Sequence, residues 1–209
     1  YLRVLVAERR QKPGNPERDV LTRLIQGEQD GEKLSEIELL QNCIFILNAG
    51  HETTTNLIGN GIRALLAHPD QKALLAADPT LITSAVEEML RFEGPTGATV
   101  RVVKTSFEMH GKTLQAGDRV YAMVNAANHD PEIFDAPERF DIRRTPNRHL
   151  TFNHGAHFCL GAPLARAEAR IAISRLFARF PNVAMAPDGV EYMDTLVMRG
   201  VREMWMVRG

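Results

Sequence analysis

A single helical pattern of about 32 residues constrains the fold of this chain more than any other feature. Ser35 and Glu38 form a capping box at its start, and His68 and Pro69 end it after Ala67. At 1.5 Å per residue such a helix is roughly 48 Å long, enough to cross a whole domain. Shorter helical patterns surround it and short strand patterns follow it, so we expect a mainly α fold with small β-sheets (α+β).

The rest of the chain divides into shorter segments around this helix. A helix end and a short helix precede it, and Gly27–Gly31 is expected to form a polar turn. After it we expect a helix, short strands, a cysteine loop, a last long helix and one or two β-hairpins. The expected boundaries, in chain order, are 1–34 and 35–67, then 81–92, 97–125, 152–161, 163–180 and 183–209.

Composition argues against several classes of partner. The 25 Lys and Arg nearly balance the 26 Asp and Glu, which argues against nucleic acid or an anionic membrane as a required partner. The longest apolar stretch, residues 43–47, is too short to span a bilayer. Two cysteines provide no disulfide framework, so a reducing cytoplasm is favoured. Tyr1 lies inside an amphipathic run, from which we expect the chain to be a fragment.

The segment 152–161, Phe-Asn-His-Gly-Ala-His-Phe-Cys-Leu-Gly, constrains the chemistry. Cys159 lies in a loop with two glycines, just before the last long helix. The unpaired N–H groups and partial positive charge at a helix start favour a thiolate over a thiol. We therefore expect Cys159 to be a ligand or a nucleophile. A buried structural cysteine is one alternative, and a zinc site formed with His154 and His157 is another.

The middle of the long helix contains residues that weaken a helix. Gly50 and the threonines at 53–55 are unfavourable there, with glycine about 1 kcal/mol worse than alanine. Small residues let a flat ligand or a small molecule approach the backbone, and a threonine hydroxyl can bond the carbonyl four residues earlier. Close packing against a crossing helix explains the same residues equally well.

Two further motifs suggest an ion-pair network. Glu88 and Arg91 share one face of a helix because they are three residues apart. Such a pair is commonly a solvated surface bridge that contributes less than ~1 kcal/mol. Pro-Glu-Arg-Phe at 137–140 adds another arginine, Arg139, at an irregular position.

Four motifs now occur in a defined order: A-G-x-E-T at 49–53, E-x-x-R at 88–91, P-E-R-F at 137–140, and F-x-x-G-x-H-x-C-x-G at 152–161. This ordered set resembles the cytochrome P-450 family, especially its soluble bacterial members. Family members are longer than this chain, so the resemblance implies that residues 1–209 are one partial domain, the C-terminal half of the fold. One departure is Asn153, where the family commonly has glycine. Asparagine is the other residue that best tolerates left-handed backbone.

The resemblance also implies roles for individual residues. Cys159 would be the axial thiolate ligand of haem b, a ligand that suits oxygen activation. Thr53 would hydrogen-bond oxygen or water, Glu52 would relay protons, and the gap at Ala49 and Gly50 would hold dioxygen. Further residues would contact the haem, its propionates or the thiolate loop: Arg101, Phe152, Gly155, His157 and Gly161. The two glycines of the loop would adopt backbone conformations closed to residues with a Cβ atom.

Structural and substrate roles follow from the same resemblance. Glu88, Arg91 and Arg139 would form a buried triad behind the haem loop, important for folding and for holding that loop. Small and aliphatic side chains on the distal side suit an apolar substrate. The expected substrate contacts are Asn48, Gly97, Ala98, Leu196 and Val197.

The activity implied is that of a haem-thiolate monooxygenase, which inserts one oxygen atom of O2 into an apolar small molecule. This chain would carry the haem-ligand and oxygen-activation half. A ferredoxin or flavodoxin-type donor, with an NAD(P)H-dependent reductase, would dock near the arginines at 143, 144, 148 and 166. Apolar surface left by the missing half would favour self-association. Two alternatives stay open: a truncated, non-catalytic remnant with or without haem, and a small zinc-binding module.

Overall fold

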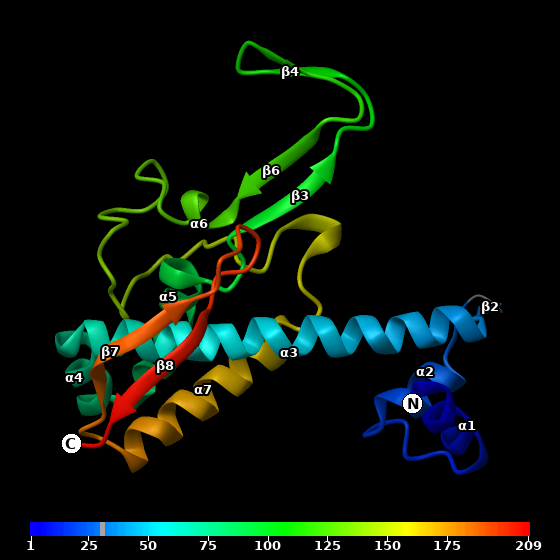
Figure 1. Ribbon diagram of the computed structural model, residues 1–209, viewed down its shortest axis with the longest axis horizontal. Helices are drawn as coiled ribbons and strands as arrows, with labels where there is room; N and C mark the ends of the chain where they lie inside the picture. The colour runs from blue at the N-terminus through cyan, green and yellow to red at the C-terminus, as the bar shows by residue number, and fades with distance from the viewer. Residues whose placement is uncertain (30–31) are drawn as a thin grey trace. The chain divides into compact units, whose positions relative to one another are not determined.

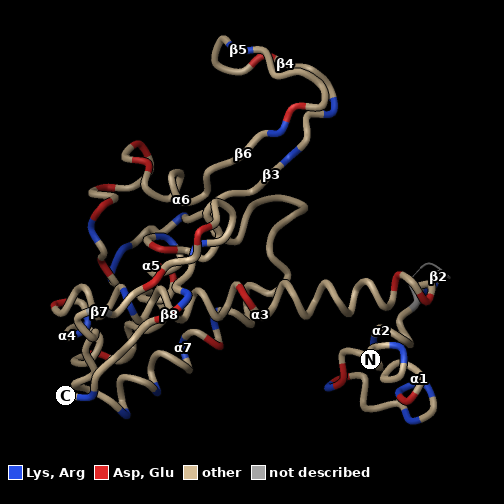
Figure 2. Tube along the Cα trace, in the orientation of Figure 1, with Lys and Arg blue, Asp and Glu red and all other residues tan. Residues whose placement is uncertain are grey.

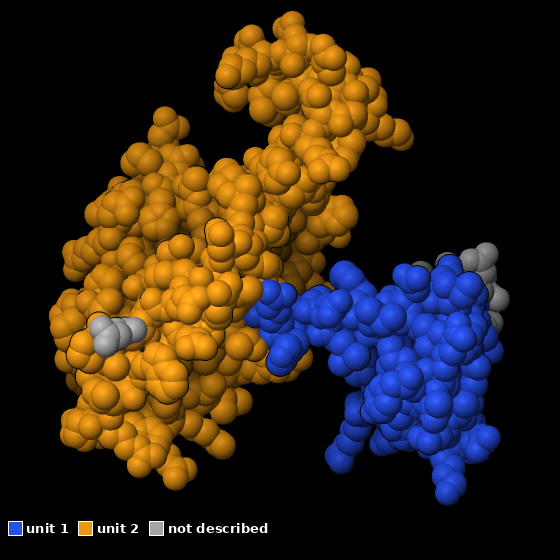
Figure 3. Space-filling model, viewed as in Figure 1, with its two compact units in different colours: residues 1–52 blue, residues 53–209 orange. Residues whose placement is uncertain are grey.

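A computed structural model describes residues 1–29 and 32–209 of the chain. Helices and small antiparallel sheets make up the structure, so the expected α+β class is confirmed (Figure 1). The chain forms two compact units, residues 1–52 and residues 53–209 (Figure 3). The long helix α3 (Glu36–Ala67) contributes residues to both units.

The first unit has a small apolar core. The unit consists of α1 (Leu2–Gln11), α2 (Val20–Gln26), the link that follows and the first part of α3. Val6 of α1 and two α3 residues, Leu39 and Cys43, are buried together. Asp19 caps α2, because its carboxylate accepts hydrogen bonds from the backbone N–H groups of Leu21 and Thr22.

The link from α2 to α3 contains two short strands. β1 (Glu28–Gln29) pairs antiparallel with β2 (Glu32–Lys33). The polar turn expected over Gly27–Gly31 therefore begins with a strand, and its last two residues lie outside the described part of the chain. The capping box at the start of α3 is present: Ser35 N–H donates to Glu38 Oε2 over 2.8 Å, and Glu38 N–H donates to Ser35 Oγ over 3.3 Å.

α3 stays helical through Gly50 and the threonines that follow it. Within the first unit, the side chains of residues 44–47 (Ile-Phe-Ile-Leu) are each 41–69% exposed. Successive residues of an α-helix point about 100° apart, so these four apolar side chains surround the helix axis. A stretch of helix that is apolar on every side is normally buried.

The second unit contains the main core. α4 (Pro69–Ala77), α5 (Ile82–Glu93) and α7 (Ala162–Arg179) pack with the second part of α3, and the short helix η1 (Pro79–Leu81) leads into α5. Gly61 lets α3 come close to the other helices. A Cβ atom at this position would lie 2.7 Å from Met89 Sδ and 3.2 Å from Ile173 Cδ1. Leu57, Leu65 and Leu90 are buried in the same core.

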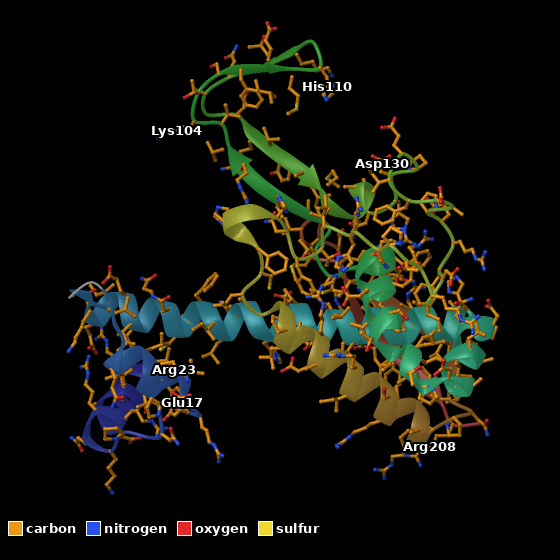
Figure 4. All side chains as sticks on the ribbon, turned by 180° about the vertical axis from the view of Figure 1, so that it is seen from behind. Glu17, Arg23, Lys104, His110, Asp130 and Arg208 are labelled. Carbon is orange, nitrogen blue, oxygen red and sulfur yellow. The ribbon has the colours of Figure 1, made fainter. Side chains whose placement is uncertain are left out.

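Three two-stranded antiparallel sheets complete the second unit. The strand pairs are β3 (Ala98–Val102) with β6 (Arg119–Met123), β4 (Phe107–Met109) with β5 (Lys112–Leu114), and β7 (Ala184–Tyr192) with β8 (Val201–Val207). The short helix α6 (Val124–Ala127) follows β6. His110 (φ 48°) and Gly111 (φ 72°) form the turn between β4 and β5, and His110 marks the tip of this hairpin in Figure 4.

Charge is spread along the chain rather than gathered by sign. Figure 2 shows both basic and acidic residues distributed along the length of the chain. Among the helices that the structure describes, none combines the length and the apolar character needed to cross a membrane.

Candidate functional site

The cysteine loop runs from Phe152 to Gly161 and includes the short helix η2 (Gly155–His157). Its two ends are joined, because Cys159 N–H donates to the carbonyl of Phe152 over 2.9 Å. Ala162 N–H donates to the carbonyl of Cys159, which places the cysteine at the start of α7. The thiol is free and half-buried. The cysteine therefore lies just before a helix N-terminus, as the sequence predicted.

Left-handed backbone occurs in this loop where it was expected, with one exception. Asn153 has a φ of 64° and Gly155 a φ of 69°, so asparagine does occupy a left-handed position. The Asn153 side chain also accepts a hydrogen bond from His154 N–H over 2.9 Å. The expectation for Gly161 was wrong, because its φ is −80°. A Cβ atom there would lie 3.8 Å from Cys159 Sγ, which is an ordinary contact.

The surroundings of the thiol fit a flat, apolar metal complex. Phe152 is buried beneath the loop, whereas Phe158 and Leu160 on either side of Cys159 are 54% and 94% exposed. A Cβ atom at Gly155 would meet nothing within 4 Å. A free sulfur donor, exposed apolar neighbours and open space above the backbone together match what a thiolate-ligated haem requires.

The zinc alternative is not supported. It required His154 and His157 to join Cys159, and both histidines are exposed. In the described ranges, 1–29 and 32–209, no group of three or more His, Cys, Asp or Glu residues is placed to hold a metal ion.

Behind the loop, α5 carries a buried and fully bonded ion pair. The guanidinium of Arg91 donates to both carboxylate oxygens of Glu88, over 2.8 and 2.9 Å, and both side chains are 0% exposed. The remaining donors of Arg91 reach backbone carbonyls of Asn128, Pro137 and Arg139. The bonds to these carbonyls join α5 to the irregular segment before the cysteine loop. The buried charges are tolerated because each one is compensated.

The second arginine of this network is Arg144, which corrects the expectation for Arg139. The Arg139 side chain is 68% exposed and lies 3.7 Å from Asp141, so only its backbone carbonyl belongs to the network. Arg144 Nε instead donates to Glu88 over 3.2 Å, and its side chain is 10% exposed. The P-E-R-F motif suggested the wrong residue because the chain turns between the two arginines. No spacing rule in the sequence singled out Arg144.

Glu87, which the sequence did not single out, binds a second set of side chains. Its carboxylate accepts two hydrogen bonds from Arg166, over 2.7 and 2.8 Å, and lies 3.1 Å from His149 Nε2. Burial raises the pKa of Glu87, but the hydrogen bonds from Arg166 and His149 and the charge of Arg166 outweigh it and lower the pKa to about 2. Glu87 is therefore ionised at neutral pH.

The structure brings together four of the expected substrate contacts. Gly97 N–H donates to the carbonyl of Val197 over 2.9 Å, and a Cβ atom at Gly97 would lie 2.6 Å from the carbonyl oxygen of Leu196. Ala98 is buried, whereas Leu196 and Val197 are 56% and 40% exposed. The fifth, Asn48, is an exposed residue of α3 in the first unit.

The residues expected to act in oxygen activation all lie on α3. Ala49, Gly50 and Glu52 are exposed residues of the first unit, and a Cβ atom at Gly50 would meet nothing within 4 Å. Thr53, the first residue of the second unit, is half-buried. The next threonine, Thr54, was not singled out and is 7% exposed.

The expected cationic surfaces are only partly available. Arg101 is exposed on β3, where its guanidinium donates to the carbonyl of Val100. Of the arginines expected to face an electron donor, Arg144 and Arg166 are held by carboxylates. Arg143 and Arg148 are exposed.

Comparison with known proteins gives a consistent picture. The family model described as Cytochrome P-450 matches residues 1–78 and 76–199. The chain is 44% identical over 207 residues to cytochrome P-450 107B1 of Saccharopolyspora erythraea, covering 98% of this chain and 50% of that protein. It is 43% identical to the biotin biosynthesis cytochrome P-450 of Bacillus subtilis, covering 98% and 51%. The chain thus spans about half the length of the curated relatives it matches.

Solved structures agree with the sequence relatives. The cytochrome P-450 PksS from Bacillus subtilis superposes with a TM-score of 0.95 at 38% identity, covering all of this chain and 54% of that one. CYP109E1 from Bacillus megaterium, in complex with testosterone, gives 0.93 at 37% identity, covering 100% and 57%. These similarities extend over both units of the chain.

Proposed function

This chain belongs to the cytochrome P-450 family, and from that membership we propose that it supplies the haem-ligand and oxygen-activation half of a monooxygenase. We treat residues 1–209 as one partial catalytic domain. The observation that carries the proposal is the free, half-buried thiol of Cys159, held at the start of α7 by the bond from its N–H to Phe152. A thiolate in this setting is the ligand that favours oxygen activation over simple electron transfer.

The residues of the loop would hold haem b through distinct contacts. Bound haem with a thiolate ligand supplies activation of O2 for insertion of one oxygen atom into a C–H or C=C bond. Cys159 would provide the sulfur, and Phe152 would shield that sulfur from water. His157 and Arg101 are exposed donors suited to the two propionates. Gly155 and Gly161 would leave space beside the macrocycle.

Protons would be delivered from α3. Thr53 Oγ1 would donate to oxygen or water in the site, and the Glu52 carboxyl would return the proton to that hydroxyl. Ala49 and Gly50 carry too little side chain to block a small molecule near the helix backbone. Glu88, Arg91 and Arg144 would take no part in turnover, and would instead fix the segment that leads into the cysteine loop.

The substrate would be an apolar small molecule. One solved relative, CYP109E1, holds testosterone, and another, P450BioI, was solved with an acyl carrier protein carrying hexadec-9Z-enoic acid. For this chain we propose contacts from Gly97, Ala98, Leu196 and Val197, whose backbones are hydrogen-bonded or adjacent, together with Asn48. Electrons would come from a ferredoxin or flavodoxin-type donor with an NAD(P)H-dependent reductase, in the cytoplasm.

The ligand assignment is tested by spectroscopy of the chain after loading with haem. The reduced, CO-bound protein is expected to show the thiolate type of absorption. Cys159→Ala is expected to lose that signature, whereas Cys43→Ala, a change at the buried cysteine of the first unit, is expected to keep it. An unchanged spectrum in Cys159→Ala would refute the assignment.

Two further measurements separate the alternatives. Stoichiometric zinc without haem binding would support a zinc module. NAD(P)H consumption that depends on both an added redox partner and an apolar substrate would support the monooxygenase over a non-catalytic haem-binding remnant. A thiolate spectrum without any such consumption would support the remnant.

A further inference from the structure

The two adjacent glutamates of α5 serve different parts of the molecule. Glu88 points to Arg91 and Arg144, in the network already described. Glu87 points to Arg166 of α7 and to His149, which precedes the cysteine loop. Because neighbouring helical residues point about 100° apart, one turn of α5 can bind both sets of partners.

The contacts of Glu87 reach both flanks of the loop. His149 lies before Phe152 in the chain, and Arg166 lies after Gly161 on α7. An ionised carboxylate only accepts hydrogen bonds, so His149 Nε2 carries the proton in this contact. That tautomer leaves His149 Nδ1 free to accept, and Thr151 N–H donates to it over 3.3 Å. The hydrogen-bond pattern is thus self-consistent on this flank.

On the other flank the guanidinium of Arg166 has two neighbours. Its Nε and one terminal nitrogen face Glu87 in a bidentate pair, and its centre lies 4.5 Å from the centroid of the Phe152 ring. The carbonyl of Phe152 in turn accepts the hydrogen bond from Cys159 N–H. A chain of contacts therefore runs from Glu87 through Arg166 and Phe152 to the cysteine.

We propose that Glu87 is a positioning residue that fastens the two ends of the cysteine loop to α5, with Arg166 and His149 as its partners. This triad lies outside the Glu88 network and holds the residues on either side of the loop, His149 before it and Arg166 after it. Fixing both ends of a loop lowers the number of conformations open to Cys159 before any ligand binds. The inference deepens the proposed function and rests on it only for the haem-dependent measurement below.

The haem-independent test is amide hydrogen exchange in the loop, measured on the chain without haem. Glu87→Gln keeps the shape of the side chain but removes its charge. We expect amides of residues 152–161 to exchange about tenfold faster in this variant, while those of α3 stay unchanged. Glu191→Gln is the matched control, because Glu191 forms an exposed pair with Arg202 on the last hairpin. Equal loop exchange in the two variants would overturn the proposal.

Arg166→Lys provides a second variant in case Glu87→Gln unfolds. Lysine keeps the positive charge but cannot form the bidentate pair or lie flat on the Phe152 ring. We expect loop exchange between that of the original chain and that of Glu87→Gln. Combining Glu87→Gln with Arg166→Gln should add little to either change alone. Additive effects would show that the two residues act independently, which contradicts the triad.

The haem-dependent measurement is the fraction of reduced, CO-bound protein with the thiolate type of absorption. Glu87→Gln is expected to lower this fraction, and Glu191→Gln is expected to leave it unchanged. An unaltered fraction and an unaltered redox potential in Glu87→Gln would overturn the link to the ligand. If the original chain binds no haem, the proposed function fails, whereas the exchange measurements still decide whether Glu87 fastens the loop.

Discussion

Glu88 shows how a single carboxylate can organise a large part of the second unit. It accepts hydrogen bonds from Arg91, from Arg144, from Asn147 and from the backbone N–H of Asp141. Its side chain is 0% exposed, so water cannot replace a lost partner. Removing one donor from such a site leaves a buried carboxylate with a lost charge-assisted hydrogen bond that water cannot restore.

The two candidate arginines are therefore expected to differ strongly. Arg144→Gln should lower the free energy of unfolding by about 2 kcal/mol, because the buried Glu88 carboxylate loses a charge-assisted hydrogen bond. Arg139→Gln should change the free energy of unfolding by less than about 0.5 kcal/mol, because the Arg139 side chain is exposed. The backbone carbonyl that accepts the hydrogen bond from Arg91 is retained in this variant. Urea unfolding of both variants measures the difference. Equal destabilisation would contradict the assignment of Arg144.

The sequence predicted the position or conformation of a residue correctly where short-range chain geometry alone determines it. The position of Cys159 just before a helix followed from the loop pattern, and the left-handed Asn153 followed from the backbone preference of asparagine. The pairing of Glu88 with Arg91 followed from helix geometry. Arg144 and the Glu87 triad were missed because their partners come from segments far apart in the chain. An irregular segment such as 128–150 has no period from which to predict those contacts.

At the scale of elements, the two glycines of α3 have opposite environments. A Cβ atom at Gly50 would meet nothing within 4 Å, whereas one at Gly61 would press on Met89 and Ile173. Both lie inside one uninterrupted helix, where alanine is intrinsically favoured over glycine by about 1 kcal/mol. The same substitution should therefore have opposite signs at the two positions.

Gly50→Ala is expected to raise the stability of the haem-free chain by about 0.5–1 kcal/mol. Gly61→Ala is expected to lower it by about 1–3 kcal/mol, because the added methyl group overpacks the core. Thermal unfolding followed by circular dichroism measures both. A destabilised Gly50→Ala would show that this stretch of α3 already contacts another part of the chain.

Element boundaries were predictable where caps and prolines define them. The capping box and the His68-Pro69 stop placed α3 within one residue of its observed start, and Gly94 and Pro95 ended α5 nearly as expected. Strand pairing was harder to predict from the sequence, because the register of a strand depends on its partner strand rather than on local composition. The sequence indicated strands within 97–125 but not that they form two separate hairpin sheets.

At the scale of the whole molecule, Glu87 should make stability depend on pH. Its folded pKa of about 2 is below the ordinary value of 4.5, so its contribution is complete above about pH 4.5 and is lost as pH falls towards 2. The difference in unfolding free energy between the original chain and Glu87→Gln should be constant from pH 7 to 5 and shrink below that. Urea titrations across this range measure it. A difference that grows in acid would contradict the sign.

Exposed apolar residues should also govern association. The side chains of residues 44–47 surround one stretch of α3 and are all exposed in the first unit. We expect the chain to self-associate through such surface, and Phe45→Glu with Leu47→Glu to reduce the association. Sedimentation velocity over a range of concentrations measures this. Ile171→Glu, a change at an exposed residue of α7, is the control. A stable monomer at high concentration would contradict the expectation.

The hairpin formed by β4 and β5 has a practical consequence. Its strands are almost wholly exposed and, among the described residues, form a two-stranded sheet of their own. A Cβ atom at Gly111, in its turn, would meet nothing within 4 Å. Inserted sequence at such a tip disturbs few backbone hydrogen bonds. A short epitope or fluorophore-binding peptide placed there would allow the protein to be purified or labelled without altering either terminus.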